Sequence, residues 1–414
     1  MELDSVQAGE QLTQNESTSN SAENEENSVV QEEIVYQYPS LFTSKTLIEL
    51  SNSSWSRHKR ANQCVQPYLR GCKCVVINDG IHVTELSRDL YTGNVAADRI
   101  IDVMDSVIHV REAGLIYDFC WFPLMNSAVP ESCCWLATRQ NAPLQMWDAF
   151  DGSLRCSYRG FDNVDQMEPA ISVTFTKDGS KIIAGYRKFI RTFDVERPGR
   201  DFAEHKIQSP ASCFDTSSNL LAVGSWNTSI SLYNVNEMGA YKGIGKMHGH
   251  RGGVTQVKFM PDGLRLVSGA RKDHRLLVWD IRYYRRPLNI LSRVVDTNQR
   301  VYFDISPCGK YLVTGGTDGV LRVWDEDQVR WKSSLDTSQD QGDNATYKFP
   351  LHKDCCNSIS IHPLRPILKI FNKKESDHES GNEDEQSVTD FDDKYNDKSE
   401  NSLVFWWIGE FLTF

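Results

Sequence analysis

The chain has 414 residues, 40% of them apolar, so it is long enough to bury a large core and is neither a disulfide-stabilised miniprotein nor a disordered chain. It contains no run of about 18 consecutive apolar residues, and an acidic segment follows Met1, so we expect neither a membrane span nor secretion. The formal net charge of −11 is unevenly distributed: residues 1–36 and residues 375–400 each contribute −9. The rest of the chain therefore carries +7, and we expect a basic folded body with acidic appendages.

The first segment, residues 1–37, is rich in Glu, Asn and Ser and has few large apolar residues. It cannot bury enough surface to offset the entropy of ordering, so we expect it to be disordered. Residues 38–414 consist of short alternating apolar runs separated by Gly, Asp and Pro, with no long run at helical period. This pattern predicts an all-β domain over residues 38–414.

A repeat organises this domain. An aromatic residue followed by Asp or Asn ends an alternating run at five places, with spacings of 46, 40, 46 and 45 residues. These are Trp147-Asp148, Phe193-Asp194, Tyr233-Asn234, Trp279-Asp280 and Trp324-Asp325. A period of about 40–45 residues is typical of the four-stranded blades of WD-repeat proteins. The sequence therefore predicts a WD-repeat β-propeller.

Two further blades are irregular. A shortened first blade is expected over residues 70–84, and the last blade is expected from Lys353 to Trp407. The acidic stretch 375–400 interrupts this last blade as a disordered loop. Together with the five regular repeats they give seven blades, and a strand near Trp55 is expected to close the ring by pairing with the C-terminal strands.

The most complete blade contains the residues of a buried polar network. His250 and Asp273 can satisfy each other's polar groups, with the Ser268 hydroxyl and the Trp279 indole in the same network. Asp318 lies six residues before Trp324, as Asp273 does before Trp279. We interpret these six residues as structural, with no contact to a ligand.

Motifs of catalytic chemistry are missing from the sequence. It contains no phosphate-binding loop, no zinc-binding HExxH motif and no nucleophile elbow. Asp162 and Asp165 are interpreted as solvated loop charges. We therefore predict a protein that is not an enzyme and that uses no cofactor, no metal and no small-molecule substrate.

Basic residues gather at the predicted turns and blade junctions. The candidate RNA-binding residues are Arg187, Arg191, Arg251, Arg271, Lys272, Arg282, Tyr283, Tyr284, Arg285, Arg286 and Arg300. Arginine binds phosphates, and planar groups such as tyrosine rings stack on the exposed bases of single-stranded RNA. For Arg282–Arg286 the alternative interpretations are an ordinary solvated loop and a docking strip for an acidic protein.

Longer stretches resemble one family in particular, from about Trp55 to Trp407 and in the same order. They are Tyr117-Asp-Phe-Cys-Trp121, Trp147-Asp-Ala-Phe150, Arg197-Pro-Gly-Arg-Asp201, Gly249-His-Arg-Gly-Gly-Val254, Ser268-Gly-Ala-Arg-Lys-Asp273 and Asn298-Gln-Arg-Val-Tyr-Phe-Asp304. These stretches, continued by Lys353-Asp-Cys355 and His362-Pro363, resemble the telomerase Cajal body protein family of WD-repeat proteins.

The resemblance implies a nuclear propeller that binds small Cajal body RNAs and directs their ribonucleoproteins, through contacts with the core proteins, to Cajal bodies. Telomerase RNA is a further candidate ligand. Arg271, Lys272 and Arg300 lie inside the matching stretches, so the resemblance favours them as RNA-binding residues. Slow closure of a β-ring through non-local contacts also favours a chaperonin as a folding partner.

Two alternatives to an RNA scaffold remain open. Trp279-Asp-Ile-Arg282 has the Trp-Asp-x-Arg form of propellers that act as substrate receptors of cullin-type ubiquitin ligases. A generic protein-only propeller adaptor is the other alternative. The acidic segments are interpreted as solubilising, and the competing hypothesis is that they compete with RNA for the basic surface.

Overall fold

The structure is a computed structural model of the whole chain. It divides into two units, Met1–Val35 and Tyr36–Phe414, and every described residue belongs to the second. Described are residues 48–54, 66–67, 73–77, 80–85, 102–103, 106–111, 114–162, 164–236, 240–326, 344–351, 355–363, 366–373 and 401–408. The segments predicted to be disordered, 1–37 and 375–400, lie outside these ranges, as do Trp55 and Lys353.

The described residues form strands grouped into seven sheets, which confirms the all-β prediction. The first two sheets in chain order contain β2 (Gln66–Pro67), β3 (Lys73–Ile77), β4 (Gly80–Glu85) and β6 (Ser106–Arg111), then β7 (Ile116–Trp121), β8 (Cys134–Arg139), β9 (Leu144–Asp148) and β10 (Leu154–Tyr158). The next two contain β11 (Ser172–Phe175), β12 (Lys181–Gly185), β13 (Phe189–Asp194) and β14 (Phe202–Lys206), then β15 (Ala211–Ser217), β16 (Leu220–Ser225), β17 (Ser229–Val235) and β18 (Tyr241–His248).

The remaining sheets continue in the same way. The fifth and sixth contain β19 (Val254–Phe259), β20 (Arg265–Ala270), β21 (Arg275–Asp280) and β22 (Asn289–Ser292), then β23 (Phe303–Ile305), β24 (Tyr311–Thr314), β25 (Val320–Asp325) and β26 (Tyr347–Pro350). The last contains β27 (Cys355–Ile361), β28 (Ile367–Lys373), β29 (Asn401–Trp407), β1 (Ile48–Ser54) and β5 (Asp102–Val103).

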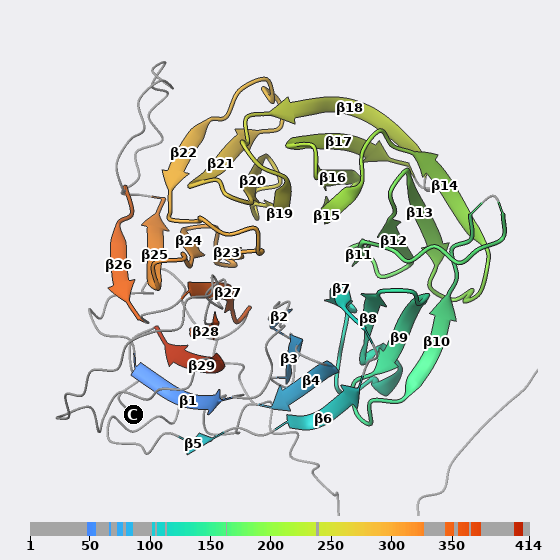
Figure 1. Cartoon of the computed structure of the whole chain (residues 1–414), viewed down its shortest axis with the longest axis horizontal. Coiled ribbons are helices and arrows are strands. Elements are labelled where there is room, and N and C mark those ends of the chain that lie inside the picture. The colour runs from blue at the N-terminus through green and yellow to red at the C-terminus, as the bar shows by residue number, and fades with distance from the viewer. Residues whose placement is uncertain are drawn as a thin grey trace, which may run out of the picture. The chain divides into compact units, whose positions relative to one another are not determined.

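Within Tyr36–Phe414 the sheets follow one another around a ring, as in a β-propeller (Figure 1). The aromatic–Asp or aromatic–Asn pairs lie at the end of the third strand in sheets two to six.

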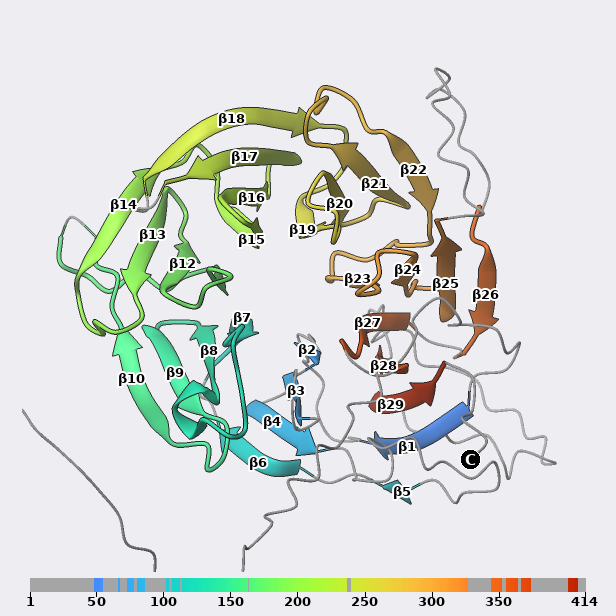
Figure 2. The ribbon, with the colours of Figure 1, turned by 180° about the vertical axis from the view of Figure 1, so that it is seen from behind.

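The ring is closed by strands from distant parts of the sequence. β1 pairs antiparallel with β29, from Ile48 opposite Trp407 to Ser54 opposite Ser402. Figure 2 shows the two strands side by side from behind. The closing strand therefore lies directly before Trp55, where the sequence predicts it.

The core lies between neighbouring sheets. Ala222 and Leu232 of the fourth sheet pack with Val257, Leu277 and Trp279 of the fifth, and each is at most 3% exposed. The facing sides of these two sheets are thus buried against each other.

Side chains also connect the innermost strands of neighbouring sheets; in the described part of the chain these strands form no backbone hydrogen bonds with each other as strands of one sheet do. Asp118 accepts a hydrogen bond from the Val173 amide at 3.0 Å, joining β7 to β11. Asp215 accepts one from the Phe259 amide at 2.6 Å, and Asp304 one from the Ile361 amide at 2.7 Å. Buried backbone N–H groups need such partners. These carboxylates therefore have structural roles around the central channel.

The polar network of the fifth sheet involves all four residues named from the sequence. The Trp279 indole donates to Ser268 Oγ at 2.8 Å, Ser268 Oγ lies 2.8 Å from His250 Nε2, and His250 Nδ1 lies 2.9 Å from Asp273 Oδ2. Burial lowers the pKa of His250, so the ring is neutral and its Nδ1–H donates to Asp273. Burial opposes ionisation of Asp273, but hydrogen bonds from His250 and Arg275 outweigh it and lower the pKa.

The sixth sheet holds its tryptophan differently. Trp324 is 2% exposed and its indole donates to Asn344 at 3.0 Å, whereas Asp318 pairs with Arg322 at 2.6 Å. Asp318 and Trp324 thus stabilise this sheet through separate partners.

Among the described residues no helix is long and apolar enough to cross a membrane.

Candidate nucleic-acid interface

The ring has two faces with different loops. Because successive strands of sheets two to six are antiparallel, the turn between the second and third strands and the link to the next sheet lie at one face. We call this the link face. The turns between the first and second strands and between the third and fourth strands lie at the other, which we call the hairpin face. Each predicted basic loop can be assigned to one of them.

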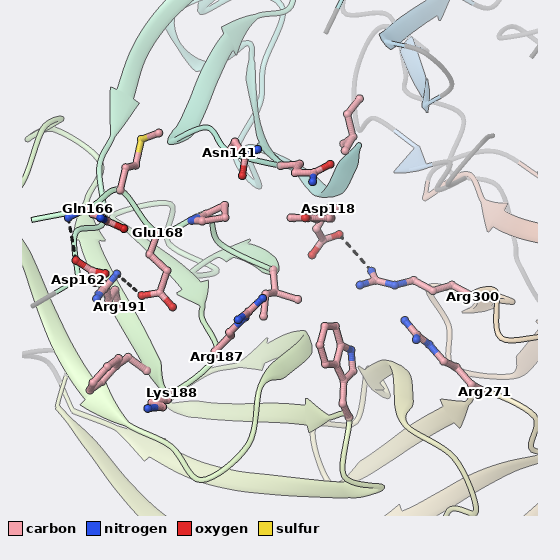
Figure 3. Close-up of a pocket in the computed structure, with 18 of the residues that line it drawn as sticks. Asp118, Asn141, Asp162, Gln166, Glu168, Arg187, Lys188, Arg191, Arg271 and Arg300 are labelled. Atoms are coloured by element: carbon pink, nitrogen blue, oxygen red, sulfur yellow. Dashed lines mark hydrogen bonds and ion pairs between the residues drawn. The ribbon is translucent and has the colours of Figure 1, made fainter. Parts of the chain in front are cut away.

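The link face contains a cavity of about 910 Å³ at the mouth of the central channel. It is lined by the β10–β11 and β22–β23 links and by the turns that carry Asn141, Arg187, Trp226 and Arg271. Figure 3 shows Arg271 and Arg300 extending into it from one side and Arg187 from another. The structure therefore brings together, from three separate parts of the sequence, four of the predicted RNA-binding residues: Arg187, Arg191, Arg271 and Arg300.

Three cations of the cavity wall have no acidic partner. Arg187 and Lys188 are exposed in the β12–β13 turn, and within the described part of the chain no ion pair involves them or Arg271. The Arg271 Nε–H is buried and has no acceptor among the described residues. Burial, and then the neighbouring Arg300, lowers the pKa of Arg271. These groups can therefore bind the oxygens of an anionic ligand.

Arg300 has partners already. Its guanidinium lies 3.9 Å from Asp118 and donates to the Ser212 carbonyl at 3.2 Å. Burial opposes its charge, but Tyr302 and Asp118 raise the pKa of Arg300. Arg300 is thus a fixed positive group that orients Asp118 and adds to the positive potential near Arg271.

Asp118 faces Arg300 from β7. Burial raises the pKa of Asp118 to about 6, and the attraction of Arg300 only partly opposes this shift. The folded protein therefore takes up a proton near pH 6, whereas the unfolded chain does so near pH 4. Between these values the folded state binds more protons, so the free energy of unfolding falls as the pH rises.

We therefore expect Asp118→Asn, which keeps an acceptor for the Val173 amide, to raise the free energy of unfolding by about 1–3 kcal/mol at pH 7.5. The gain should shrink towards pH 4.5, where Asp118 is protonated in the folded wild type. Urea unfolding at several pH values measures it, with Asp165→Asn as a control because Asp165 is 76% exposed. A gain that is equal at all pH values would contradict the assignment.

Arg191 also lines the cavity, but its guanidinium is already committed to partners within the protein. It is 2% exposed, pairs with Glu168 at 3.2 Å and Glu204 at 3.0 Å, and lies over the Tyr186 ring at 4.3 Å. It lies within β13, and one side of that strand is buried against the neighbouring sheet. We therefore remove Arg191 from the candidate RNA-binding residues and assign it a structural role.

Replacing Arg191 by Met should accordingly destabilise the fold by about 3 kcal/mol, because two carboxylates lose their partner. Urea unfolding of the purified chain measures the loss. Arg187→Met is the matched control, since Arg187 is exposed and its replacement should change stability by less than about 0.5 kcal/mol. Equal stabilities of the two variants would rule out the structural role.

The two remaining candidates of this face are exposed. Lys272 lies in the β20–β21 turn with a positive φ of 47°, beside Arg271. Arg251 lies in the β18–β19 link, where its amide donates to Asp273 at 3.0 Å. Neither lines the cavity, so both can contact only RNA that extends across the face.

The stretch Arg282–Arg286 belongs to the hairpin face, because it forms the β21–β22 turn. Arg282 pairs with Asp280 at 2.7 Å, and Arg285 and Arg286 are exposed. Tyr283 is 76% exposed, whereas Tyr284 packs against Gly245 of β18 and donates to the Ile244 carbonyl at 3.2 Å. These five residues therefore lie on the face of the ring opposite the cavity.

Two residues of the cavity are not among the predicted RNA-binding residues. Trp226 is not named from the sequence, and Asp162 is interpreted there as a solvated loop charge. Trp226 is 45% exposed on the cavity wall. The sequence feature that could have identified it is an aromatic residue in a predicted turn, because the corresponding turns of other sheets carry Asn141 or Lys188. Asp162 lines the cavity and accepts the Gln166 amide at 2.8 Å, so it shapes the β10–β11 link. Among the described residues no cluster of His, Cys, Asp or Glu could hold a metal ion.

The fold and the repeats define a WD-repeat β-propeller: the model of the WD domain, G-beta repeat, matches residues 242–280 and 297–325. The chain is 37% identical over 393 residues to the telomerase Cajal body protein 1 homolog of Drosophila melanogaster, covering 88% of this chain and 69% of that protein. It is 36% identical to telomerase Cajal body protein 1 of Bos taurus (81% and 63%) and 35% identical to that of Homo sapiens (86% and 66%).

The chain therefore belongs to the telomerase Cajal body protein 1 family, which confirms the resemblance seen in the sequence. It spans about two thirds of the length of these relatives. None of these names is that of an enzyme.

Proposed function

We propose that this chain is a non-catalytic scaffold that binds small Cajal body RNAs at the link face. It would bring their ribonucleoproteins, through contacts with the core proteins, to Cajal bodies in the nucleus. Membership of the telomerase Cajal body protein 1 family supports the class of RNA. The same names make telomerase RNA a second candidate ligand.

The observation that carries the proposal is the set of unmatched cations around the cavity. Arg187, Lys188 and Arg271 have no ion-pair partner in the described part of the chain, and the cavity lies where links from several sheets converge. Phosphate oxygens supply the missing negative charge, and the release of counterions from RNA makes such binding favourable. A cavity of about 910 Å³ falls in the range of about 300–1,000 Å³ that holds one small ligand, so it fits unstacked nucleotides of a loop better than a duplex.

The test is crosslinking of the wild-type chain to RNA in nuclear extract, followed by sequencing of the bound RNAs. We expect enrichment of small Cajal body RNAs over a mock purification. If no RNA is enriched, the scaffold proposal fails, and a protein-only adaptor becomes the better explanation of the propeller.

A further inference from the structure

Trp226 stands out among the exposed aromatic residues. Phe150, Trp226 and Tyr283 are the most exposed aromatic side chains of the described part, at 48%, 45% and 76%. Phe150 lies in the β9–β10 turn and Tyr283 in the β21–β22 turn, both on the hairpin face. Trp226, in the β16–β17 turn, lines the cavity of the link face. Leaving an indole half exposed on a polar surface is costly unless something covers it.

The backbone that carries Trp226 is held in place. Its amide lies 3.4 Å from the Pro210 carbonyl as a hydrogen-bond donor, and Thr228 of the same turn has a φ of 71°. Gly253 of the next link lies so close that a Cβ there would be 3.0 Å from the Trp226 carbonyl. The indole is therefore presented by a fixed turn, so little backbone entropy is lost when a ligand covers it.

A cation lies next to this ring. The Arg271 guanidinium carbon is 5.9 Å from the centre of the Trp226 ring, and the Arg271 Nε–H has no acceptor among the described residues. An exposed indole next to a guanidinium that has no ion-pair partner among the described residues matches the two parts of one nucleotide, a planar base and a phosphate. An apolar peptide side chain would cover the indole but would leave the Arg271 charge without an anionic partner.

We propose that Trp226 stacks on one unpaired base of the bound RNA and that Arg271 binds the phosphate next to that base. This inference rests on the proposed function and specifies how the cavity holds a single nucleotide. The base is turned out of its loop, because a base within a stack offers no free face to the indole. Arg187 and Lys188 then bind phosphates on the other side of the cavity.

The probe for the test is a library of RNA stem-loops with eight randomised loop nucleotides, from which the tightest loop is selected on the wild-type chain. That loop is then synthesised with an abasic site at each position in turn. Affinities of the wild type and of Trp226→Ala, Trp226→Phe, Tyr283→Ala and Arg271→Ala are measured by fluorescence anisotropy at several salt concentrations. Circular dichroism confirms that each variant is folded.

We expect Trp226→Ala to bind the selected loop about tenfold to a hundredfold more weakly and Trp226→Phe to recover most of the affinity. Tyr283→Ala should bind like the wild type. One abasic site should weaken wild-type binding as much as Trp226→Ala does, and it should have no further effect in that variant. The dependence of affinity on salt should be unchanged in Trp226→Ala but should lose about one phosphate contact in Arg271→Ala.

The outcomes separate the two proposals. If the wild-type chain selects no loop, the proposed function fails and the inference fails with it. If the wild type binds a loop and Trp226→Ala binds it equally well, only the stacking role is overturned. If Trp226→Ala is weaker but no single abasic site reproduces the loss, the indole supports the site without stacking on a base, and the inference is also wrong.

Discussion

Replacement of Asp273 by Ala is expected to lower the free energy of unfolding by about 3–5 kcal/mol, which is a large share of the stability of a folded domain. Asp273 is 1% exposed and accepts hydrogen bonds from the His250 ring, the Arg251 amide and the Arg275 guanidinium. Without it, a buried N–H of His250 and the Arg275 charge lose their partner. The variant tests whether the four-residue network stabilises the fifth sheet.

The measurement is urea unfolding at pH 7.5, and Asp318→Ala is the matched control. Asp318 precedes Trp324 by the same six residues, but its carboxylate is 28% exposed and pairs with Arg322 rather than with a histidine. We expect that variant to lose less, about 1–2 kcal/mol, because the Arg322 guanidinium, 5% exposed, loses a partner but no buried histidine does. Equal losses in the two variants would show that the network adds nothing beyond a single ion pair.

The second large effect concerns RNA. The double variant Arg187→Glu/Arg271→Glu is expected to bind a small Cajal body RNA about a hundredfold more weakly or worse, because two charge-assisted contacts are lost and two repulsions are introduced. Both side chains lie on the cavity wall without an acidic partner in the described part of the chain. The fold should be retained, because neither guanidinium supports the core.

Filter binding at several salt concentrations measures this loss. The control is Arg282→Glu/Arg285→Glu, which changes the net charge equally but on the hairpin face. It should keep the affinity within about threefold, since salt screens charges that are farther away than about 10 Å. The same control tests the ubiquitin-ligase alternative, which requires Arg282. Equal losses in both double variants would contradict a localised RNA site.

Much of the fold could be predicted from the sequence because the aromatic–Asp pairs fall at one structural position. In sheets two to six they end the third strand, where the aromatic ring packs between sheets, as Trp279 does at 0% exposure. The sequence predicts a shortened first blade, over residues 70–84, but β2 and β6 complete it as a four-stranded sheet. Ring closure could be predicted, since a strand near Trp55 is expected to pair with the C-terminal strands. The pairing of β1 with β29 has this form.

The candidate site was harder to predict because proximity in sequence does not give the face. Arg271 and Arg282 are separated mainly by β21, whose six residues span about 20 Å and carry the chain from one face to the other. Arg191 lies only four residues from Arg187, yet it lies inside β13 and is buried. Arg187 and Arg191 carry the same charge, so composition does not separate them. Only the position of the strand boundary shows that Arg187 lies in a turn and Arg191 in a strand.

The central claim is that RNA binds at the link face, and photo-crosslinking followed by mass spectrometry tests it most directly. The chain is bound to a small Cajal body RNA, irradiated and digested, and the crosslinked peptides are identified. We expect crosslinks in the peptides that contain Trp226, Arg271 and Arg187, which line one cavity. Crosslinks concentrated in the peptide that contains Arg282–Arg286 would place the RNA on the hairpin face and contradict the claim.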